Sequence, residues 1–378
     1  MRVCHITTVH PRYDIRIFWR QCVTLAQAGH EVTLLVNDEF GDEINNGVRI
    51  LSLRHPRRNR IARALSLGVR KEVLKKARDL RADIYHIHDP ELLGLGYQLK
   101  KSGCVVVYDS HEDVPRQIMT KEWLPKFARP IVSRLFELYE NRLVRCFNAV
   151  IVPTPHIRTR FRVITRRVWE VCNFPALDEI VYSEQQYSNL NPACYVGDLS
   201  VNRGILQIAE ATKRAGVELY LCGEFTSEQL KTELLSKYEH VRHFGILNRV
   251  EVARFLVGAS MGFVTLHNTS SYAAAYPIKM FEYMAAGIPV IASNFPVYKA
   301  IVEGSNCGIC VDPLDVDAIA DAVKLIRSDR VLADRFRSNG RKAVTKKYSW
   351  ESQASKLLDC YYSITANDYS LLDGRRHC

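Results

Sequence analysis

Short apolar runs alternate with amphipathic stretches through the first half of the chain. Residues 1–9 predict a buried strand, and residues 15–30 predict a helix that ends near a glycine. The pattern recurs, with strands predicted at 31–37, 48–53, 82–89, 104–113 and 148–154 and helices at 57–80, 90–103 and 127–147. Strands that alternate with helices form parallel sheets covered by helices on both faces. Residues 1–175 therefore predict a doubly wound α/β domain.

The same alternation restarts in the second half, after an irregular segment at residues 173–192 that indicates a linker. Strands are predicted at 194–199, 217–223, 241–245, 261–266 and 308–313, with helices at 203–216, 227–238, 249–259 and 316–327. Residues 190–345 thus predict a second Rossmann-like domain, and residues 346–366 contain a terminal helix. Two such sheets in one chain predict a ligand-binding cleft between two domains.

Composition places the chain among cytoplasmic globular proteins. It has 378 residues, of which 47% are apolar and 25% charged, as is usual for two domains of ordinary size. The first ten residues lack the apolar run of a signal peptide, and no stretch reaches the roughly 20 apolar residues of a transmembrane helix. The 11 cysteines are scattered along the chain, so we expect buried, reduced thiols and neither disulfides nor a metal centre.

The positive charge lies almost wholly in the first half. Of the net +11, residues 1–180 contribute +10, from 30 Lys and Arg against 20 Asp and Glu. Residues 181–378 contribute +1, from 22 against 21. A basic half-molecule suits an anionic partner such as nucleic acid, anionic lipid or a diphosphate. A solvated surface is the more ordinary explanation when the charge excess is taken alone.

Polar residues gather where three predicted strands end. The loop His10–Phe18 follows the first strand and has no glycine, which excludes the usual dinucleotide-binding fingerprint. Alternation puts His86 and His88 on one side of another strand. Asp109–Asp113, with His111 at its centre, ends a third. The carboxyl ends of parallel strands meet at one edge of a sheet, where ligands bind in such folds.

Structural explanations stand beside the functional ones. Asp14 is a good N-cap and Arg16 an ordinary solvated charge, and Asp89 before Pro90 is a plain helix start. Two histidines on one strand face can bind zinc, but no third ligand is evident nearby in the sequence, and we expect no metal.

The segment Tyr276–Pro296 predicts a short helix, a stop at Gly287 and a buried strand. Lys279, Glu282 and Tyr283 are three and four residues apart, so they share one helix face. A lysine and a carboxylate on a small-residue helix at the end of sheet strands suit a ligand that carries both hydroxyl and phosphate groups.

Further anion-binding features surround this segment in the second domain. Arg203 and Gly204 stand at the start of a predicted helix, where backbone N–H groups and the helix dipole favour negative charge. Gly223 follows a predicted strand and permits close backbone approach to a ligand. Gly245 lies in a loop after the next strand. Loop glycines are mostly structural, so these two are weak signals alone.

The segment Tyr276–Pro296 resembles the donor-site helix of retaining glycosyltransferases of family 4. Those enzymes usually carry Glu-x7-Glu, whose second Glu begins a Glu-small-small-Gly-x-Pro-Val pattern, and Glu282 matches this second Glu. The loop His10–Phe18 resembles a family subgroup with a His-Pro-x-x-Asp-x-Arg loop, and His111 resembles the histidine beside the transferred sugar. The resemblance covers nearly the whole chain. It implies the GT-B fold, in which two Rossmann-like domains face each other across a cleft and residues 346–366 pack back on the first.

The resemblance also implies roles for the candidate residues. Glu282 would hold the donor ribose, Arg203 and Lys279 would neutralise the diphosphate, and His111 would stand beside the reacting carbon. Further donor contacts are implied at Gly204, Gly223, Gly245 and Tyr283. Acceptor contacts are implied at His10, Asp14, Arg16 and His88.

Two positions depart from the family pattern. Ala274 stands where the first Glu of Glu-x7-Glu falls, and Asp198 stands where a phosphate-binding Arg falls. Arg203 then takes the position of the family's Lys, and Lys279 is a substitute for the missing cation. The sequence thus predicts a nucleotide-sugar site but not the identity of the sugar.

The implied activity is transfer of a sugar from a UDP- or GDP-linked donor to a glycan acceptor, with retention of anomeric configuration. Retaining enzymes of this family generally lack a protein nucleophile, so front-face attack is implied, with the donor phosphate taking the acceptor's proton. No metal or other cofactor is expected. A nucleotide-sugar 2-epimerase on the same fold and a non-catalytic binding protein remain alternatives, and Ala274 and Asp198 favour the second.

Two basic regions in the first half predict a membrane-facing surface. The first is a dense run made by Arg57, Arg58, Arg60, Arg63, Arg70, Lys71, Lys75, Lys76 and Arg78. The second interleaves Trp123, Leu124, Phe127, Ile131 and Phe136 with Lys121, Lys126, Arg129 and Arg134. Basic and aromatic side chains together favour an anionic membrane surface, and no nucleic-acid motif accompanies them. We therefore expect a peripheral protein on the inner face of a bacterial membrane, with a lipid-linked acceptor from surface polysaccharide synthesis.

Overall fold

The computed structural model describes residues 1–53, 67–121, 123–182, 188–269 and 272–373. The chain divides into two compact units, which are taken separately below. Unit 1 is Met1–Cys172 together with Gln353–Cys378, and unit 2 is Asn173–Ser352. The described part of the predicted linker at residues 173–192 therefore belongs to unit 2. No helix in the described ranges is long and apolar enough to cross a membrane.

Unit 1 is built on an eight-stranded sheet with the strand order β3-β4-β2-β1-β5-β6-β7-β8. Its strands are β1 (Arg2–Ile6), β2 (Glu31–Val36), β3 (Glu43–Asn45), β4 (Val48–Ser52), β5 (Ile84–Ile87), β6 (Val105–Asp109), β7 (Ala149–Val152) and β8 (Val168–Glu170). The pairings are parallel except for β3 with β4, which are antiparallel. The pattern of apolar and polar residues does not predict β3 or β8, because a strand of three residues is too short to show alternation.

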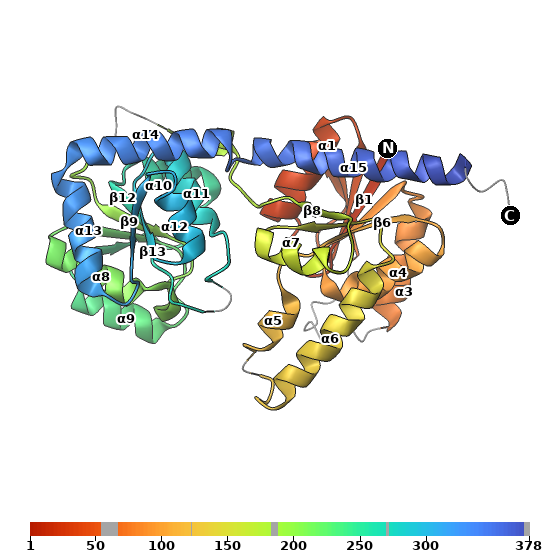
Figure 1. Ribbon diagram of the computed structural model, residues 1–378, viewed down its shortest axis with the longest axis horizontal. Helices are drawn as coiled ribbons and strands as arrows, with labels where there is room; N and C mark the ends of the chain where they lie inside the picture. Colours follow the sequence, from red (N-terminus) through yellow and green to blue (C-terminus); the bar gives the residue numbers. More distant parts are fainter. Residues whose placement is uncertain (54–66, 122, 183–187, 270–271, 374–378) are drawn as a thin grey trace. The chain divides into compact units, whose positions relative to one another are not determined.

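Helices cover both faces of this sheet (Figure 1). They are η1 (Ile15–Cys22), α1 (Val23–Gln27), α3 (Leu67–Asp79), η2 (Pro90–Leu92), α4 (Leu93–Lys101), α5 (Val114–Ile118), α6 (Ala128–Val144) and α7 (Pro155–Arg162). The first helix begins as a π-helix, a wider turn that periodicity alone does not predict. Strands β1 and β5 are buried along nearly their whole length, as expected where helices cover both faces.

Unit 2 contains a six-stranded parallel sheet with the order β11-β10-β9-β12-β13-β14. Its strands are β9 (Ala193–Val196), β10 (Leu219–Cys222), β11 (Val241–His243), β12 (Met261–Val264), β13 (Val290–Ser293) and β14 (Gly308–Val311). Its helices are η3 (Leu177–Glu179), η4 (Val201–Arg203), α8 (Ile205–Ala215), α9 (Glu228–Lys237), α10 (Arg249–Val257), α11 (Ile278–Ala286), α12 (Pro296–Val302), α13 (Val316–Ser328) and α14 (Arg330–Lys346).

Alternation along β12 shows which helices lie on which face of the unit 2 sheet. Met261 and Phe263 belong to a buried core that includes residues of α8, α9 and α13, and α8 packs beside α13 (Figure 1). Gly262 points the other way, against the ring of Tyr283 on α11. Helix α11 therefore covers the face opposite α8.

The last helix, α15 (Trp350–Asp373), begins in unit 2 and continues into unit 1. The terminal helix predicted within residues 346–366 thus starts four residues later, after α14 ends at Lys346. In unit 1 the helix buries Tyr361 against His5 and His86 of the sheet.

Candidate functional site

In unit 1 the predicted polar groups meet at the carboxyl ends of β1, β5 and β6. His5 of β1 and His86 of β5 are register partners, and His88 follows two residues after His86. All three rings are buried, at 0%, 0% and 1% exposure. The rings of His86 and His88 stack with centroids 4.5 Å apart, and His5 lies 4.5 Å from His86. Three buried imidazoles in one layer form the histidine layer of this site.

Hydrogen bonds join the histidine layer to the edge of the sheet. His5 Nδ1 lies 2.9 Å from His88 Nε2, and His88 Nδ1 lies 3.2 Å from Nε2 of the partly exposed His111. On the inner side, the Tyr361 hydroxyl lies 2.7 Å from His86 Nδ1 and 3.3 Å from His5 Nε2. Burial lowers the pKa of His88 to about 3, and it lowers the pKa values of His5 and His86 well below their usual range. These three rings are therefore neutral.

Asp109 is the buried charge at the centre of the cluster. Arg16 donates to both carboxylate oxygens, at 2.9 and 2.7 Å, and Gln21 donates at 2.7 Å. Burial raises the pKa of this carboxyl, but the charge of Arg16 and the hydrogen bonds from His111 and His88 outweigh it. The pKa of Asp109 therefore lies well below its usual range, and the group is ionised.

Arg16, which was predicted to contact the acceptor, has its hydrogen bonds within the protein. Its side chain is 5% exposed, and beyond Asp109 it donates to the Val171 carbonyl at 2.8 Å. A guanidinium with these partners uses its N–H donors for hydrogen bonds within the protein. We therefore assign Arg16 the task of positioning Asp109.

His10 and Asp14 lie beside His111 at the rim. The rings of His10 and His111 are 4.6 Å apart, and the His10 nitrogens lie 3.5 Å from carboxylate oxygens of Asp14 and Asp89. Burial lowers the pKa of His10, but the hydrogen bond with Asp14 and the charges of Asp89 and Asp14 outweigh it, so the pKa is raised. Asp14 also caps η1 through the backbone N–H groups of Arg16 and Ile17.

Asp89 does not cap the helix that follows it. Its side chain makes no capping hydrogen bond to η2 and instead accepts from the Thr7 hydroxyl at 3.0 Å and the Thr8 N–H at 2.5 Å. The predicted helix start at Pro90 is present, and the carboxylate ties the loop after β1 to the end of β5.

The polar edge of unit 1 resembles a metal site in spacing but not in chemistry. His88 Nδ1, Asp109 Oδ2 and His111 Nε2 lie 3.2–3.4 Å apart. A metal there would compete with three donated hydrogen bonds on Asp109 and would add charge beside Arg16. In the histidine layer the ring of His88 stacks on those of His5 and His86, whereas a bound metal must lie in the plane of each ring. We therefore assign a metal to neither group of described residues.

In unit 2 the second cluster surrounds the start of α11. Lys279 is 8% exposed, and within the described residues its Nζ is buried without a hydrogen-bond partner. The ammonium lies 3.6 Å from the centre of the Tyr195 ring, and a Cβ on Gly197 would meet it at 2.9 Å. Burial and the charge of Arg203 lower the pKa of Lys279 well below its usual range. A buried ammonium of this kind calls for an anion.

Arg203 and Gly204 complete the wall of this cluster. Gly204 adopts φ +76° ahead of α8, and a Cβ there would lie 2.3 Å from the Thr265 carbonyl oxygen. Arg203 donates to the Asp198 carboxylate at 2.8 Å and lies over the Tyr272 ring. Position 198, where the family carries an Arg, thus holds a carboxylate that forms an ion pair with Arg203. The buried Thr265 hydroxyl, which sequence analysis missed, also has no partner in the described ranges.

Glu282 is half-buried on α11 and acts electrostatically on Lys279. Tyr283 was predicted to contact the donor. It is fully buried, and its hydroxyl accepts from the Val196 N–H at 2.9 Å. Lys279, Glu282 and Tyr283 do lie on one helix, as predicted, but the Tyr283 side chain is buried in the protein core. We therefore assign Tyr283 a structural role, in which it binds the end of β9.

The two predicted loop glycines have structural neighbours. A Cβ on Gly223, whose φ is +140°, would lie 2.1 Å from the Gly197 carbonyl oxygen. The Gly223 N–H donates to the Gly245 carbonyl at 2.7 Å. These contacts account for Gly223 without a ligand, and donor contacts at both positions stay predictions.

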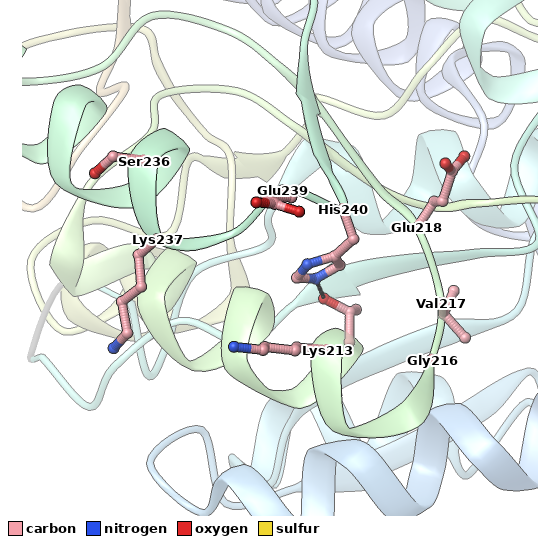
Figure 2. A pocket seen from close by; sticks show the side chains of 9 residues that line it. Lys213, Gly216, Val217, Glu218, Ser236, Lys237, Glu239 and His240 are labelled. Carbon is pink, nitrogen blue, oxygen red and sulfur yellow. Dashed lines mark hydrogen bonds between the residues drawn. The ribbon is translucent and has the colours of Figure 1, made fainter.

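A surface pocket of about 610 Å³ lies elsewhere in unit 2 (Figure 2). It contains none of the predicted site residues. Its lining includes Glu218 and His240, which directly precede β10 and β11, so the pocket lies at the amino ends of these strands. Ligands of such sheets bind at the opposite, carboxyl ends. His240 Nε2 is already 3.0 Å from the Thr212 hydroxyl.

Comparison with known proteins assigns each part of the chain to a glycosyltransferase family. A model described as Glycosyltransferase Family 4 matches residues 16–171, and one described as Glycosyl transferases group 1 matches residues 178–343. The phosphatidyl-myo-inositol mannosyltransferase of Mycobacterium leprae is 30% identical over 152 residues, 40% of this chain and 39% of that protein. The match thus spans about two fifths of that relative.

Longer matches are more distant. The MMP α-(1→4)-mannosyltransferase of Mycolicibacterium hassiacum is 23% identical over 90% of this chain and 92% of its own. Among solved structures, sucrose-phosphate synthase from Thermosynechococcus elongatus aligns with a TM-score of 0.77 at 19% identity, covering 97% of this chain and 99% of that one. HepE of Anabaena, solved with UDP and glucose, aligns with a TM-score of 0.70 at 13% identity, covering 96% of this chain and 100% of that one.

The structural likeness shows the fold, and the two family models together span most of the chain. The protein has the GT-B fold and belongs to the glycosyltransferases of family 4.

Proposed function

We propose that this protein transfers a sugar from a nucleotide sugar to a lipid-linked glycan acceptor, with retention of anomeric configuration. Unit 2 binds the donor and unit 1 binds the acceptor. The relatives named above include mannosyltransferases, and HepE was solved with UDP. Both facts are compatible with a UDP- or GDP-linked donor, and neither selects one.

The observation that carries the proposal is the buried Lys279 amino group, which lies beside Arg203 and has no hydrogen-bond partner within the described residues. Isolated buried charges are costly, so proteins retain them where a ligand supplies the counter-charge. The start of α8 adds backbone N–H groups and the positive end of its dipole. A diphosphate fits this cluster, since it carries negative charge on two adjacent groups.

These side chains also suit the departure of the nucleoside diphosphate. Lys279 and Arg203 stabilise the charge that develops on the leaving phosphate, as preorganised cations do. Glu282 accepts hydrogen bonds from the ribose hydroxyls. We infer no resident metal, because the two side-chain cations supply the positive charge. The acceptor attacks from the face the phosphate leaves, and the phosphate oxygen takes its proton.

The acceptor side rests on the polar edge of unit 1. His111 is partly exposed, between His10 and the buried Asp109. A neutral imidazole can donate through one nitrogen and accept through the other, so His111 suits a sugar hydroxyl. His10 and Asp14 flank it, and His88 holds it from below through the 3.2 Å contact.

The lipid-linked nature of the acceptor rests on the surface of α5 and α6. Figure 1 shows these helices beside each other, and the Ser133 hydroxyl donates to the Pro115 carbonyl at 2.7 Å between them. An outward stripe, called the apolar stripe here, is made by Trp123, Phe127, Ile131, Leu135 and Leu138, exposed by 64%, 80%, 60%, 63% and 51%. The exposed Lys126 and Arg134 flank it. Such a stripe favours insertion into an anionic membrane surface.

Part of the predicted basic surface lies outside the described residues, namely Arg57, Arg58, Arg60 and Arg63. Nothing is described of the Arg70 side chain either. The remaining basic residues of that run, Lys71, Lys75, Lys76 and Arg78, lie on α3 with at least part of each side chain exposed. We propose that these charges add to binding at the inner face of a bacterial membrane, where the glycan would enter a surface polysaccharide.

A screen of UDP- and GDP-linked sugars by thermal shift tests the donor assignment. A donor present at about 100 times its Kd should stabilise the protein by about 2.7 kcal/mol. Lys279→Gln should weaken donor binding by about 1.5–3 kcal/mol, because a charge-assisted contact is lost. Lys299→Gln, which changes an exposed lysine of unit 2, is the matched control. Stabilisation by no nucleotide sugar would overturn the proposal.

Two alternatives have distinct outcomes. A nucleotide-sugar 2-epimerase would convert the donor without any acceptor. A non-catalytic binding protein, which Ala274 and the Asp198–Arg203 pair favour, would bind the donor but transfer nothing to extracted lipid-linked glycans. The transferase predicts release of nucleoside diphosphate that depends on acceptor concentration.

A further inference from the structure

The buried hydroxyl of Tyr361 on α15 ends a continuous chain of side-chain hydrogen bonds in unit 1. From Tyr361 the chain passes to His5, at 3.3 Å, then to His88, at 2.9 Å, and from there to the Asp109–His111 edge. His86 joins at the Tyr361 hydroxyl, at 2.7 Å. Each neutral imidazole carries one N–H and one lone pair. If one nitrogen of a ring donates a hydrogen bond, the other nitrogen must accept one, so the donor in one hydrogen bond determines the donor in the next.

With neutral rings, two proton arrangements form all these hydrogen bonds while the Tyr361 hydroxyl also donates one of them. In the first, His86 Nδ1–H donates to the Tyr361 oxygen, Tyr361 donates to His5 Nε2, and His5 Nδ1–H donates to His88 Nε2. The proton of His88 then sits on Nδ1. In the second, every bond is reversed, and the proton of His88 sits on Nε2.

The surroundings choose between the two arrangements. His88 Nδ1 lies 3.4 Å from the ionised Asp109 Oδ2, so a proton there meets a carboxylate. A lone pair there would face that charge and could be satisfied only by a proton on His111 Nε2, 3.2 Å away. His86 Nε2 is buried without a partner among the described residues. The first arrangement leaves a bare lone pair at that atom, and the second leaves an orphaned N–H, which is the rarer and costlier defect. Both observations favour the first.

We propose that Tyr361 is a positioning residue for the acceptor site. Its hydroxyl sets the tautomers of His5 and His88, so that His88 presents Nδ1–H to Asp109. His111 Nε2 lies 3.4 Å from the same carboxylate oxygen, and a hydrogen bond donated there excludes one between the two ring nitrogens, which lie 3.2 Å apart. The Nε2 side of His111 is thereby turned to Asp109, which leaves Nδ1 to contact a sugar hydroxyl. The last step rests on the proposed function, whereas the tautomer pattern does not.

Tautomers are read directly from long-range ¹H–¹⁵N spectra of protein labelled at histidine, with resonances assigned by single histidine substitutions. In the native protein we expect His5, His86 and His88 each to carry the proton on Nδ1. A proton on Nε2 of His88 overturns the proposal, whatever the protein's activity. This measurement needs no variant that might misfold.

Tyr361→Phe removes the hydroxyl and should let His5 and His88 sample both tautomers. Tyr362→Phe is the matched control, because it removes the same group from the next residue of α15, whose side chain is 53% exposed. For transfer, Tyr361→Phe should lower kcat by about tenfold to a hundredfold with the donor KM unchanged. Unchanged His5 and His88 tautomers in the folded Tyr361→Phe variant overturn the proposal. Altered tautomers without any transferase activity in the native protein would instead count against the proposed function.

Discussion

At the scale of single residues, Asp198 is the departure from the family pattern that has the clearest consequence. Its carboxylate is 67% exposed and pairs with Arg203 at 2.8 Å. Where the family carries a cation that binds the donor diphosphate, this chain has a carboxylate. That carboxylate competes with the diphosphate for Arg203. A half-exposed ion pair adds little to the stability of the fold. The chain could therefore lose the Asp198–Arg203 pair and still fold.

Asp198→Asn should therefore strengthen donor binding. Removal of the competing charge frees Arg203 and lowers repulsion of the diphosphate, by about 0.2–1 kcal/mol, or up to about fivefold in Kd. Calorimetric titration measures the change. Asp317→Asn is the control, since Asp317 forms an ion pair with Arg214 in the same unit. Weaker donor binding in Asp198→Asn would show that the carboxylate contacts the ligand favourably.

Lys279 predicts a linkage between donor binding and protons. Its pKa is lowered from 10.5 by burial and by Arg203, and a bound diphosphate should raise it. Between those two pKa values the complex holds more protons than the free protein, so donor affinity should fall as pH rises. The sign for folding is opposite: the unfolded chain binds more protons in the window below 10.5, and stability due to this group rises with pH.

Calorimetry in buffers of different ionisation enthalpy measures the proton uptake directly. We expect uptake of up to about one proton per donor in the native protein and none in Lys279→Gln. Equal uptake by both proteins would assign the proton to another group.

Residue identity and spacing predicted Lys279, His88 and His111 as members of polar clusters. They did not predict Tyr361, because it is distant in sequence from His5 and nothing local in α15 marks it. They also did not predict the partners of Arg16 and Tyr283 within the protein. Both side chains have a polar end and helical spacing suited to a ligand, and only the packing shows that Asp109 and the Val196 N–H occupy them.

At the scale of elements, Tyr283 joins α11 to the end of β9. Its ring lies against Gly262, where a Cβ would come within 2.5 Å, and its hydroxyl satisfies the Val196 N–H next to Gly197. The element that carries Lys279 is thus fixed to the strand end that shapes the donor cluster.

Tyr283→Phe should lower the free energy of unfolding by about 1–3 kcal/mol, because a buried backbone N–H loses its acceptor. Donor affinity should change much less if Tyr283 acts through packing alone. Denaturant titration measures the first and calorimetry the second. Tyr220→Phe serves as control, since that hydroxyl contacts the exposed Glu218. A large loss of affinity with unchanged stability would restore the predicted donor contact.

Helices and buried strands of ordinary length were predictable from periodicity, since a long apolar face must be covered. The π-helix η1 was not, because the spacing of apolar residues at 15–22 does not separate a wider turn from an ordinary helical one. Strand β3 was missed for a related reason: it owes its place to pairing with β4 and has no pattern of its own.

At the scale of the whole molecule, the two-sheet architecture followed from the repeat of strand and helix in each half. The boundaries followed less well, because residues 173–182 lack periodicity yet belong to unit 2. The charge asymmetry and the apolar stripe are also whole-molecule properties. The excess of positive charge did not by itself indicate which partner unit 1 binds. The exposure of Phe127 and Leu135 at α6 favours a membrane surface over nucleic acid.

The apolar stripe predicts binding to vesicles that contain anionic lipid. Phe127→Ser with Leu135→Ser should weaken binding by about tenfold or more, because each side chain contributes about 1.5–3 kcal/mol when fully buried. Ile246→Ser with Val331→Ser is the control, since these unit 2 side chains are 74% and 78% exposed. Co-sedimentation with anionic and neutral vesicles, at low and high salt, separates insertion from charge attraction. Equal binding by the two double variants would show that the stripe is not the contact, and the search for the acceptor would then turn to soluble glycans.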